Sequence, residues 1–186
     1  MNLKFRPATR KDLPEIVRML ADDFLGTSRE RYENPLPESY VKAFAEIDAD
    51  KNNELIVVYL SEQEAVATGS NNSSAMIDTE NHSVATASRS DKTANEIIVG
   101  TLQITFTPSI SFQGGKRATV ESVRVDAQYR GQGIGKELMN WAINRARQEN
   151  CVAMQLTTNN DRTDAHRFYE NLGFKGSHLG MKLYLR

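Results

Sequence analysis

The groups best suited to chemistry lie in a glycine-rich stretch, residues 128–135, between an expected strand and an expected helix. Its three glycines are spaced by two, so the backbone can approach a ligand and turn successive N–H groups towards it. The start of a helix adds unpaired N–H groups and the positive end of the helix dipole. Arg130 and Lys136 add positive charge. We therefore expect an anionic group, such as a phosphate or pyrophosphate, to bind here.

Two common phosphate-binding loops do not fit this stretch. A dinucleotide-binding loop, G-x-G-x-x-G, requires a third glycine where one frame places Lys136 and the other places Leu138. A P-loop requires glycine at the position of Arg130, and Ser or Thr at the position of Glu137. These mismatches disfavour a nucleotide-binding protein. A tight turn that is rich in glycine only for packing remains the alternative.

Two motifs in order relate the chain to a known family. Arg130-x-x-Gly133-x-Gly135 matches the R/Q-x-x-G-x-G/A acetyl-CoA signature of the GNAT superfamily of N-acetyltransferases. Residues 165–174, AHRFYENLGF, are similar to the A-x-x-F-Y-x-x-x-G-F segment of that superfamily. One expected helix and one expected strand separate the motifs. The chain therefore resembles a bacterial-type, acetyl-CoA-dependent GNAT enzyme over most of its length, residues 61–95 being the departure.

The resemblance implies acetyl-CoA as co-substrate, with no metal. In the family, amides of the signature loop bind the CoA pyrophosphate, and the preceding strand holds the pantetheine arm and acetyl carbonyl through its backbone. Here these roles fall on Gln132, Gly133, Ile134, Gly135 and Lys136, with Arg130 and Gly131 at the loop entrance, and on Val123, Arg124 and Val125 in the strand. A side chain after the next strand often contacts CoA. Asn160 or Asn159 stands about there, while the family spacing points nearer Arg162.

Acetyl transfer to an amine requires a neutral nitrogen and a stabilised leaving thiolate. An alkyl amine has a pKa of about 10.4, so about one molecule in 2,500 is neutral at pH 7. Glu121, two residues before the acetyl-holding segment, is the candidate general base, directly or through a water. Its alternative roles are a hairpin charge or a partner of Arg124. The resemblance places Tyr169 beside the leaving sulfur as a hydrogen-bond donor, and its alternative role is a core aromatic.

The other reactive side chains have simpler structural interpretations. His166 and His178 are alternative acid–base groups, but lone histidines are more often structural. Cys151 begins an expected strand and is interpreted as a buried filler; a single cysteine permits no internal disulfide. No Cys/His cluster has metal-site spacing. Trp141 lies off the apolar stripe of its helix and is interpreted as a packing or dimer-contact residue.

Hydrophobic periodicity places these residues on ten elements. Strands and helices alternate in the order β-α-α-β-β-β-α-β-α-β, which predicts an α/β chain around a mixed sheet. The resemblance identifies this order as the GNAT acyl-CoA N-acyltransferase fold. The expected strands are residues 3–6, 55–60, 96–106, 118–126, 152–156 and 181–185, and the expected helices cover residues 13–24, 40–47, 133–146 and 165–172. Thr9 and Asp12 resemble a capping box before the first helix.

Residues 61–95 differ in kind from the rest of the chain. They are rich in Ser, Thr, Asn and Ala, and they contain no aromatic residue and no proline. So few apolar side chains cannot offset the entropy of ordering the segment. We interpret it as a polar, mobile insertion between two strands of a single N-acetyltransferase domain, residues 1–186.

Charge and composition limit the partners. The net charge of −1, from 23 basic and 24 acidic residues, argues against a nucleic-acid or membrane binder. With no targeting segment or long apolar run, we expect a cytoplasmic protein.

The acceptor is expected to be a small-molecule or protein amine. In the family the link between the first two helices shapes the acceptor pocket. Here it is acidic, with Asp22, Asp23, Glu30 and Glu33, which suits a cationic amine. Polyamines, aminoglycosides, amino acids and protein amines all remain possible acceptors. The alternative function is a non-catalytic CoA-binding or regulatory module, and a homodimer is a further possibility.

Overall fold

A five-stranded mixed sheet forms the centre of the computed structural model, which describes residues 1–22, 26–61 and 96–185. Neighbouring strands pair antiparallel except the last pair, β4 and β5, which is parallel. In sheet order the strands are β1 (Lys4–Pro7), β2 (Asn53–Ser61), β3 (Glu96–Pro108), β4 (Lys116–Val125) and β5 (Cys151–Leu156). This mixed sheet confirms the predicted fold class.

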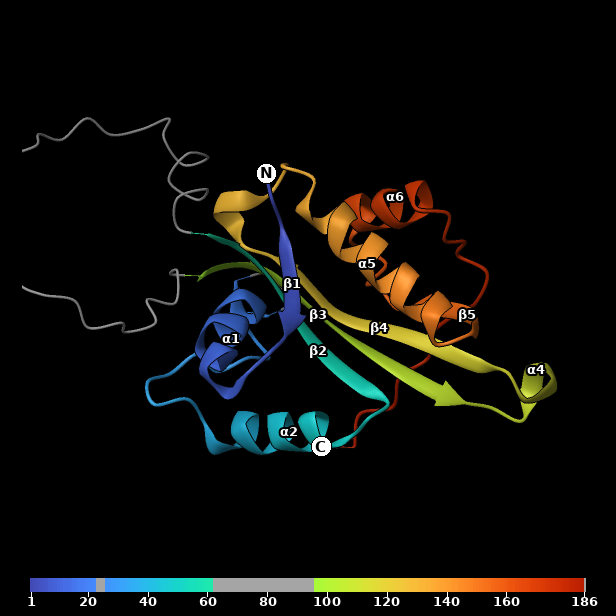
Figure 1. Cartoon of the computed structure of the whole chain (residues 1–186), viewed down its shortest axis with the longest axis horizontal. Coiled ribbons are helices and arrows are strands. Elements are labelled where there is room, and N and C mark those ends of the chain that lie inside the picture. The colour runs from blue at the N-terminus through green and yellow to red at the C-terminus, as the bar shows by residue number, and fades with distance from the viewer. Residues whose placement is uncertain (23–25, 62–95, 186) are drawn as a thin grey trace, which may run out of the picture.

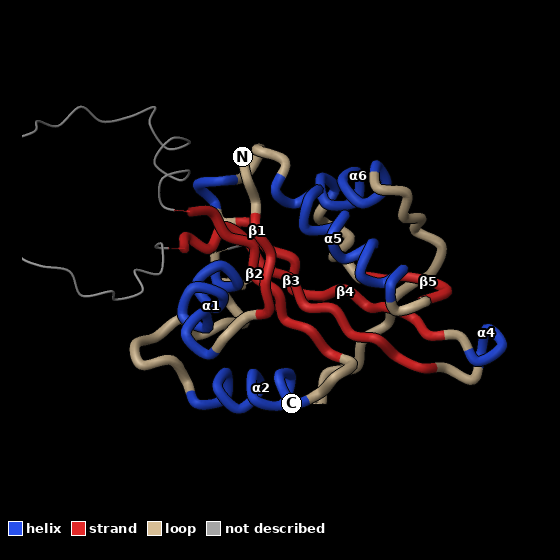
Figure 2. Tube along the Cα trace, viewed as in Figure 1, coloured by secondary structure: helices blue, strands red, loops and turns tan. Residues whose placement is uncertain are grey.

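Helices cover both faces of the sheet (Figures 1 and 2). The helices are α1 (Leu13–Ala21), α2 (Glu38–Ala49), the short α4 (Ser111–Gly114), α5 (Ile134–Gln148) and α6 (Thr163–Asn171), with 3₁₀ turns η1 (Arg10–Asp12) and η2 (Ala127–Tyr129). One apolar core joins α5 to the sheet and contains Leu102 and Leu138. A second core joins α1 and α2 to the opposite face and contains Leu13, Phe44 and Val57.

The helix that follows the glycine-rich stretch forms as its periodicity predicts. The apolar residues of α5 recur every three or four positions, so they fall on one face. Five of them are buried against the sheet, namely Ile134, Leu138, Met139, Ala142 and Ala146, and Trp141 and Ile143 are partly buried. This packing fixes the start of α5, and with it the position of the glycine-rich loop.

The insertion joins two paired neighbours in the sheet. Ser61, the last residue of β2, pairs with Glu96, the first residue of β3. The chain therefore leaves and re-enters the sheet at one place. The predicted insertion, apart from Ser61, lies outside the described residues.

The predicted final strand, residues 181–185, is wrong. These residues form no strand, and their large apolar side chains are exposed. Figure 1 shows the C-terminus well away from β5, the strand that such a segment would extend. Apolar alternation predicts a strand only where a neighbouring edge supplies hydrogen bonds, and here the segment does not lie along that edge.

Candidate functional site

Strands β4 and β5 pair over only part of their length. Their register runs from Lys116 opposite Cys151 to Val120 opposite Leu156, while β4 continues to Val125. Beyond Val120, no described strand pairs with this side of β4. We call residues 121–125 the open edge of β4. Backbone groups on an unpaired edge need other partners, so this edge can bind an extended ligand.

A β-bulge at Ser122 shapes the open edge. Ser122 has a φ of 55°, and the register shifts so that Glu121 lies opposite Gln103 and Arg124 opposite Thr101. Residues directly opposite each other on paired strands point to the same face. Thr101 lies opposite Val57, which belongs to the core beneath α1 and α2. Glu121 and Arg124 therefore share the α1/α2 face of the sheet.

The glycine-rich loop follows directly at the end of β4. Gly131 and Gly133 have φ values of 78° and 84°, in the left-handed region that favours glycine. Gly133 is the N-cap of α5. A Cβ atom on Gly135 would lie 3.5 Å from Phe168 Cζ and 3.7 Å from Val125 Cγ2. The start of α5, the end of β4 and α6 therefore meet at this position.

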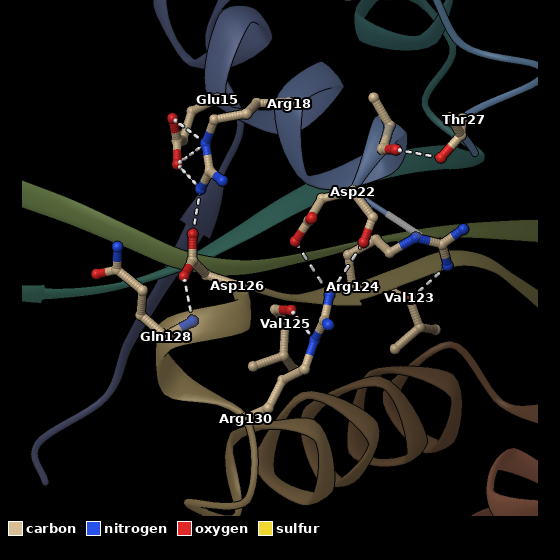
Figure 3. Close-up of polar contacts among 11 residues, drawn as sticks. Glu15, Arg18, Asp22, Thr27, Val123, Arg124, Val125, Asp126, Gln128 and Arg130 are labelled. Atoms are coloured by element: carbon tan, nitrogen blue, oxygen red, sulfur yellow. Dashed lines mark hydrogen bonds and ion pairs between the residues drawn. The ribbon is translucent and has the colours of Figure 1, made fainter. Parts of the chain in front are cut away.

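A buried carboxylate ties α1 to the end of β4 (Figure 3). The Asp126 side chain accepts a hydrogen bond from the Gln128 N–H at 2.8 Å and pairs with Arg18, which also binds Glu15. The hydrogen bond to Glu15 raises the pKa of the Arg18 guanidinium far above its usual value; burial opposes this shift and Asp126 adds to it. The sequence analysis missed Arg18 and Asp126. An aspartate just after a strand and two residues before a turn amide is the signal that could have identified Asp126.

The Arg130 side chain folds back over β4 instead of pointing along the loop (Figure 3). Its Nε donates to the Val125 carbonyl at 3.2 Å, and a terminal nitrogen lies 3.3 Å from Asp22 Oδ2. The Val125 carbonyl, one of the backbone groups that the resemblance assigns to the pantetheine arm and the acetyl carbonyl, thus already accepts a hydrogen bond from Arg130. Its contacts position the loop entrance against the end of α1.

Tyr169 lies at the junction between α6 and the open edge. Its ring makes edge-on contacts with Phe168 and Phe174, at centroid distances of 5.1 Å and 5.9 Å. Burial raises the pKa of the phenol, and the nearby charges of Arg162 and Arg124 partly oppose that rise. The phenol therefore keeps its proton at neutral pH and can act as a hydrogen-bond donor.

The side chains of Glu121 and Asn160 are held by fewer contacts than that of Tyr169. Glu121 is exposed and has no side-chain partner among the described residues. Asn160 lies in an exposed turn that is organised by its neighbour, because Asn159 Oδ1 accepts from the Asp161 N–H at 2.9 Å. No contact brings Asn160 to Tyr169 within the described part of the chain. Of the three residues considered for this contact, Asn159, Asn160 and Arg162, only Arg162 carries a charge, and that charge acts on Tyr169.

The other singled-out side chains make structural contacts. His166 donates from Nε2 to the Asn159 carbonyl at 2.9 Å, and His178 shares a 2.8 Å hydrogen bond with Ser177. Burial raises the pKa of the Cys151 thiol, which disfavours the nucleophilic thiolate. Trp141 stacks on Phe5 at 6.2 Å.

The described part of the acceptor loop is partly closed by its own contacts. The Tyr40 hydroxyl donates to Glu30 Oε2 at 3.0 Å, and Arg31 pairs with Glu33 at 2.9 Å. Asp22 contacts Arg130, as above, and the predicted Asp23 lies outside the described residues. The acidic side chains of this loop that the structure describes, Asp22, Glu30 and Glu33, are therefore engaged with neighbouring groups.

Among the residues that the structure describes, no group of three His, Cys, Asp or Glu side chains is placed to hold a metal ion. No helix in residues 1–22, 26–61 and 96–185 is both long enough and apolar enough to span a membrane.

Comparison with known proteins identifies a family that this chain matches. A model of the acetyltransferase (GNAT) family matches residues 16–174. A crystal structure described as a transcriptional regulator from Bacillus halodurans C-125 is 47% identical, with a match that covers 99% of this chain and all of that one, at a TM-score of 0.76.

Two curated relatives match shorter stretches. Aminoalkylphosphonate N-acetyltransferase of Salmonella typhimurium is 51% identical over 50 residues, which is 27% of this chain and 32% of the relative. Glucosamine 6-phosphate N-acetyltransferase of Trypanosoma brucei brucei is 32% identical over 88 residues, which is 47% of this chain and 58% of the relative. The chain thus spans less than two thirds of the length of either relative.

Proposed function

This chain belongs to the acetyltransferase (GNAT) family, and from that membership we propose that it moves the acetyl group of acetyl-CoA to a primary amine by direct attack in a ternary complex. The family makes the protein an acyltransferase. Acetyl-CoA is the co-substrate of that family, and the direct mechanism and the acceptor class are our proposal.

The observation that carries the proposal is the junction of the open edge of β4, the start of α5 and Tyr169. The amides of residues 132–136 lie at a helix start, where an anionic pyrophosphate is favoured. The open edge of β4 has no partner strand that would compete with an extended pantetheine arm, although its Val123 and Val125 carbonyls already accept hydrogen bonds from Arg124 and Arg130. Arg124 links the two sides of the site, since it lies on the α1/α2 face and its charge acts on Tyr169.

The proposed residues divide the reaction between them. The amine nitrogen forms a bond to the acetyl carbon, the carbon–sulfur bond breaks, and the amine proton passes to Glu121 or to a water that Glu121 holds. Forming the neutral amine from an alkyl ammonium ion costs about 4.6 kcal/mol at pH 7. A general base that accepts the proton reduces this cost. Tyr169 donates a hydrogen bond to the departing thiolate. A phenol is a weaker acid than a thiol, so donation without full proton transfer is its role.

The first acceptors to test are small amines that carry a phosphorus oxyanion. The names of the two curated relatives described above specify such amines, an aminoalkylphosphonate and glucosamine 6-phosphate. Arg124 places a positive charge on the face shared with Glu121, which would suit the oxyanion. Polyamines, aminoglycosides, amino acids and peptide amines complete the panel.

A thiol-release assay with acetyl-CoA across this panel tests the proposal. We expect amine-dependent CoA release for at least one class, and acetylated product by mass spectrometry. Thermal shift measures donor binding separately: acetyl-CoA at 100 times its Kd should add about 2.7 kcal/mol to the free energy of unfolding. ATP is the control anion. Absence of stabilisation by both CoA and acetyl-CoA would overturn the proposal.

A second candidate function is a CoA-binding regulatory module of the same fold. The structure at 47% identity is described as a transcriptional regulator, which supports this alternative. Stabilisation by acetyl-CoA without CoA release from any amine in the panel would favour the module over the enzyme, because fold alone does not determine function.

A further inference from the structure

The hydroxyl of Tyr169 can donate a hydrogen bond to the leaving sulfur but is too weak an acid to protonate it. Burial raises the pKa of Tyr169 above its usual value of about 10, whereas a thiol has a pKa of about 8.5. The phenol therefore keeps its proton, and the sulfur leaves as a thiolate. An anion in a site shielded from water is costly unless hydrogen bonds or positive charges compensate it.

Two arginines bring positive charge to the Tyr169 hydroxyl from different elements. Arg162 is the N-cap of α6 and precedes Tyr169 by seven positions. An α-helix turns once in about 3.6 residues, so seven positions are about two turns, and the two residues lie along one side of α6. The charges of Arg162 and Arg124 both oppose the effect of burial on the pKa of Tyr169, and Arg162 has the larger effect.

Arg124 brings its charge to the open edge of β4. The Asp126 N–H donates to the Val99 carbonyl of β3 at 3.0 Å. The N–H and C=O groups of one trans peptide point in opposite directions, so the Val125 carbonyl points away from β3 and towards the open edge. Val123, two residues earlier on the strand, directs its carbonyl the same way. The Arg124 guanidinium donates to this Val123 carbonyl at 2.9 Å (Figure 3).

The two charges therefore lie close to the place that the resemblance assigns to the leaving sulfur. Residues 123–125 are the part of β4 assigned to the pantetheine arm and the acetyl carbonyl, and Tyr169 is assigned to the sulfur. A guanidinium stays charged at any pH at which the protein works, and its N–H groups can donate to an anion. Arg124 and Arg162 can thus supply the compensating charge that a phenol lacks.

We propose that Arg124 and Arg162 stabilise the departing CoA thiolate by their positive charge, while Tyr169 donates its hydrogen bond. The carbon–sulfur bond breaks with its electron pair on sulfur, and the amine proton goes to Glu121 or to a water that Glu121 holds. The thiolate takes a proton from solvent after release. This inference rests on the proposed acetyl transfer, to which it adds the way in which the leaving group is stabilised.

The acidity of the bound CoA thiol is the direct test. The ultraviolet absorbance of the thiolate is followed against pH in the CoA complex, and the complex with desulfo-CoA is subtracted so that the titration of protein groups cancels. An opposite charge within about 4–6 Å lowers a pKa by about 1–3, so we expect the pKa of the bound thiol to lie at least about 1 below that of free CoA. Equal values for bound and free CoA overturn the proposal. The measurement contains no acceptor, so a contact between Arg124 and an acceptor oxyanion does not enter it.

Substitutions show whether the two arginines cause the shift. Arg162→Gln and Arg124→Gln should each raise the pKa of the bound thiol by about 0.5–1, whereas Arg162→Lys and Arg124→Lys, which keep the charge, should retain most of the lowering. Arg167→Gln is the matched control, because it removes one charge from the same helix at a side chain that is 73% exposed and pairs with Asp164. This variant should leave the pKa of the bound thiol unchanged.

Circular dichroism and calorimetric titration with CoA check that each variant is folded and binds the ligand. Glu121 and His166, titratable side chains on the same two elements, are unaltered in every protein compared, so their charges cancel in the differences. If Arg124→Gln does not fold, Arg124→Lys and the two Arg162 variants are compared instead. An equal shift in Arg167→Gln, or no shift in any folded glutamine variant of the two arginines, overturns the proposal. CoA that binds with an unaltered thiol pKa overturns this inference alone, whereas failure of CoA to bind overturns the proposed acetyl transfer as well.

Discussion

At the scale of single residues, the neighbours of Tyr169 determine what its hydroxyl can do. Burial keeps the phenol protonated, and the charges of Arg162 and Arg124 lie close enough to act on it. Its ring is held separately, by contacts with Phe168 and Phe174. The hydroxyl can therefore be removed without disturbing the packing.

We expect Tyr169→Phe to lower kcat by about 10- to 100-fold, because a hydrogen bond to a charged group contributes about 1.5–3 kcal/mol. The KM for acetyl-CoA should stay within about twofold, since the loop amides are untouched. Steady-state kinetics measure both values, with Tyr184→Phe as the control, because Tyr184 is 83% exposed and lies outside the acceptor loop. An unchanged kcat would assign Tyr169 to the core only.

Glu121 is exposed on the α1/α2 face, so its proposed role as general base can be tested without disturbing the packing. We expect Glu121→Gln to lower kcat/KM by about 100-fold at pH 7. The loss should shrink as the pH approaches the pKa of the amine, about 10.4 for an alkyl amine, because the neutral amine no longer needs a base. Glu46→Gln, on the exposed side of α2, is the control.

The pH profile of this variant distinguishes two roles. A loss that is the same at every pH would assign Glu121 to acceptor binding. An unaltered profile would remove Glu121 from the reaction, and the base would then be sought elsewhere on the same face.

At the scale of elements, the turn from β4 into α5 contains two glycines, Gly133 and Gly135, that are needed for different reasons. Gly133 needs its left-handed φ of 84°, and nothing lies within 4 Å of the Cβ that a substitution would add. Gly135 lies inside α5, where an added Cβ would make ordinary contacts with Phe168 and Val125. One glycine is therefore required by conformation, and the other has room for a methyl group.

We expect Gly133→Ala to weaken acetyl-CoA binding by about tenfold or more, because a left-handed alanine costs about 1–2 kcal/mol. Gly135→Ala should leave the affinity within about twofold, since 3.5 Å and 3.7 Å are normal van der Waals separations. Isothermal titration calorimetry compares the pair. Equal effects from the two substitutions would contradict this account of the loop.

At the scale of the whole molecule, one buried carboxylate joins distant parts of the chain. Asp12 accepts from the Thr9 N–H at 2.6 Å, as the predicted capping box requires, and binds Arg6 through both oxygens. Arg6 also binds Glu96, at the point where the chain re-enters the sheet. Burial alone would raise the pKa of Asp12, but the bonds from Arg6 and Thr9 outweigh it and lower the pKa.

The sign of this shift predicts the pH dependence of stability. A carboxylate with a lowered pKa in the folded state stabilises the fold above its unfolded pKa of about 3.9, and this contribution is lost as the pH falls through the folded value. We expect Asp12→Asn to lower the free energy of unfolding by about 1–3 kcal/mol at pH 7, with the difference shrinking below about pH 4. Urea unfolding at several pH values measures it. Asp164→Asn, whose side chain is 98% exposed, should have little effect at any pH.

Most elements could be predicted because their signals are local. The apolar spacing of α5 and the glycines before it depend on residues a few positions apart, and both formed as predicted. The prediction of a strand at residues 181–185 was wrong because a strand needs more than a local pattern. Apolar alternation is a local property, but a strand also needs the edge of another strand to pair with.

The sequence by itself determined the family motifs, the glycine-rich turn and the order of most elements, since neighbouring residues encode these through backbone preference and apolar spacing. Only the tertiary structure decided where β4 and β5 part, that Glu121 and Arg124 share a face, and that Arg18 reaches Asp126 across 108 positions of sequence. Those features depend on strand register and on contacts between distant residues. Register and such contacts are set by how the whole sheet packs against its helices, which no short stretch of sequence contains.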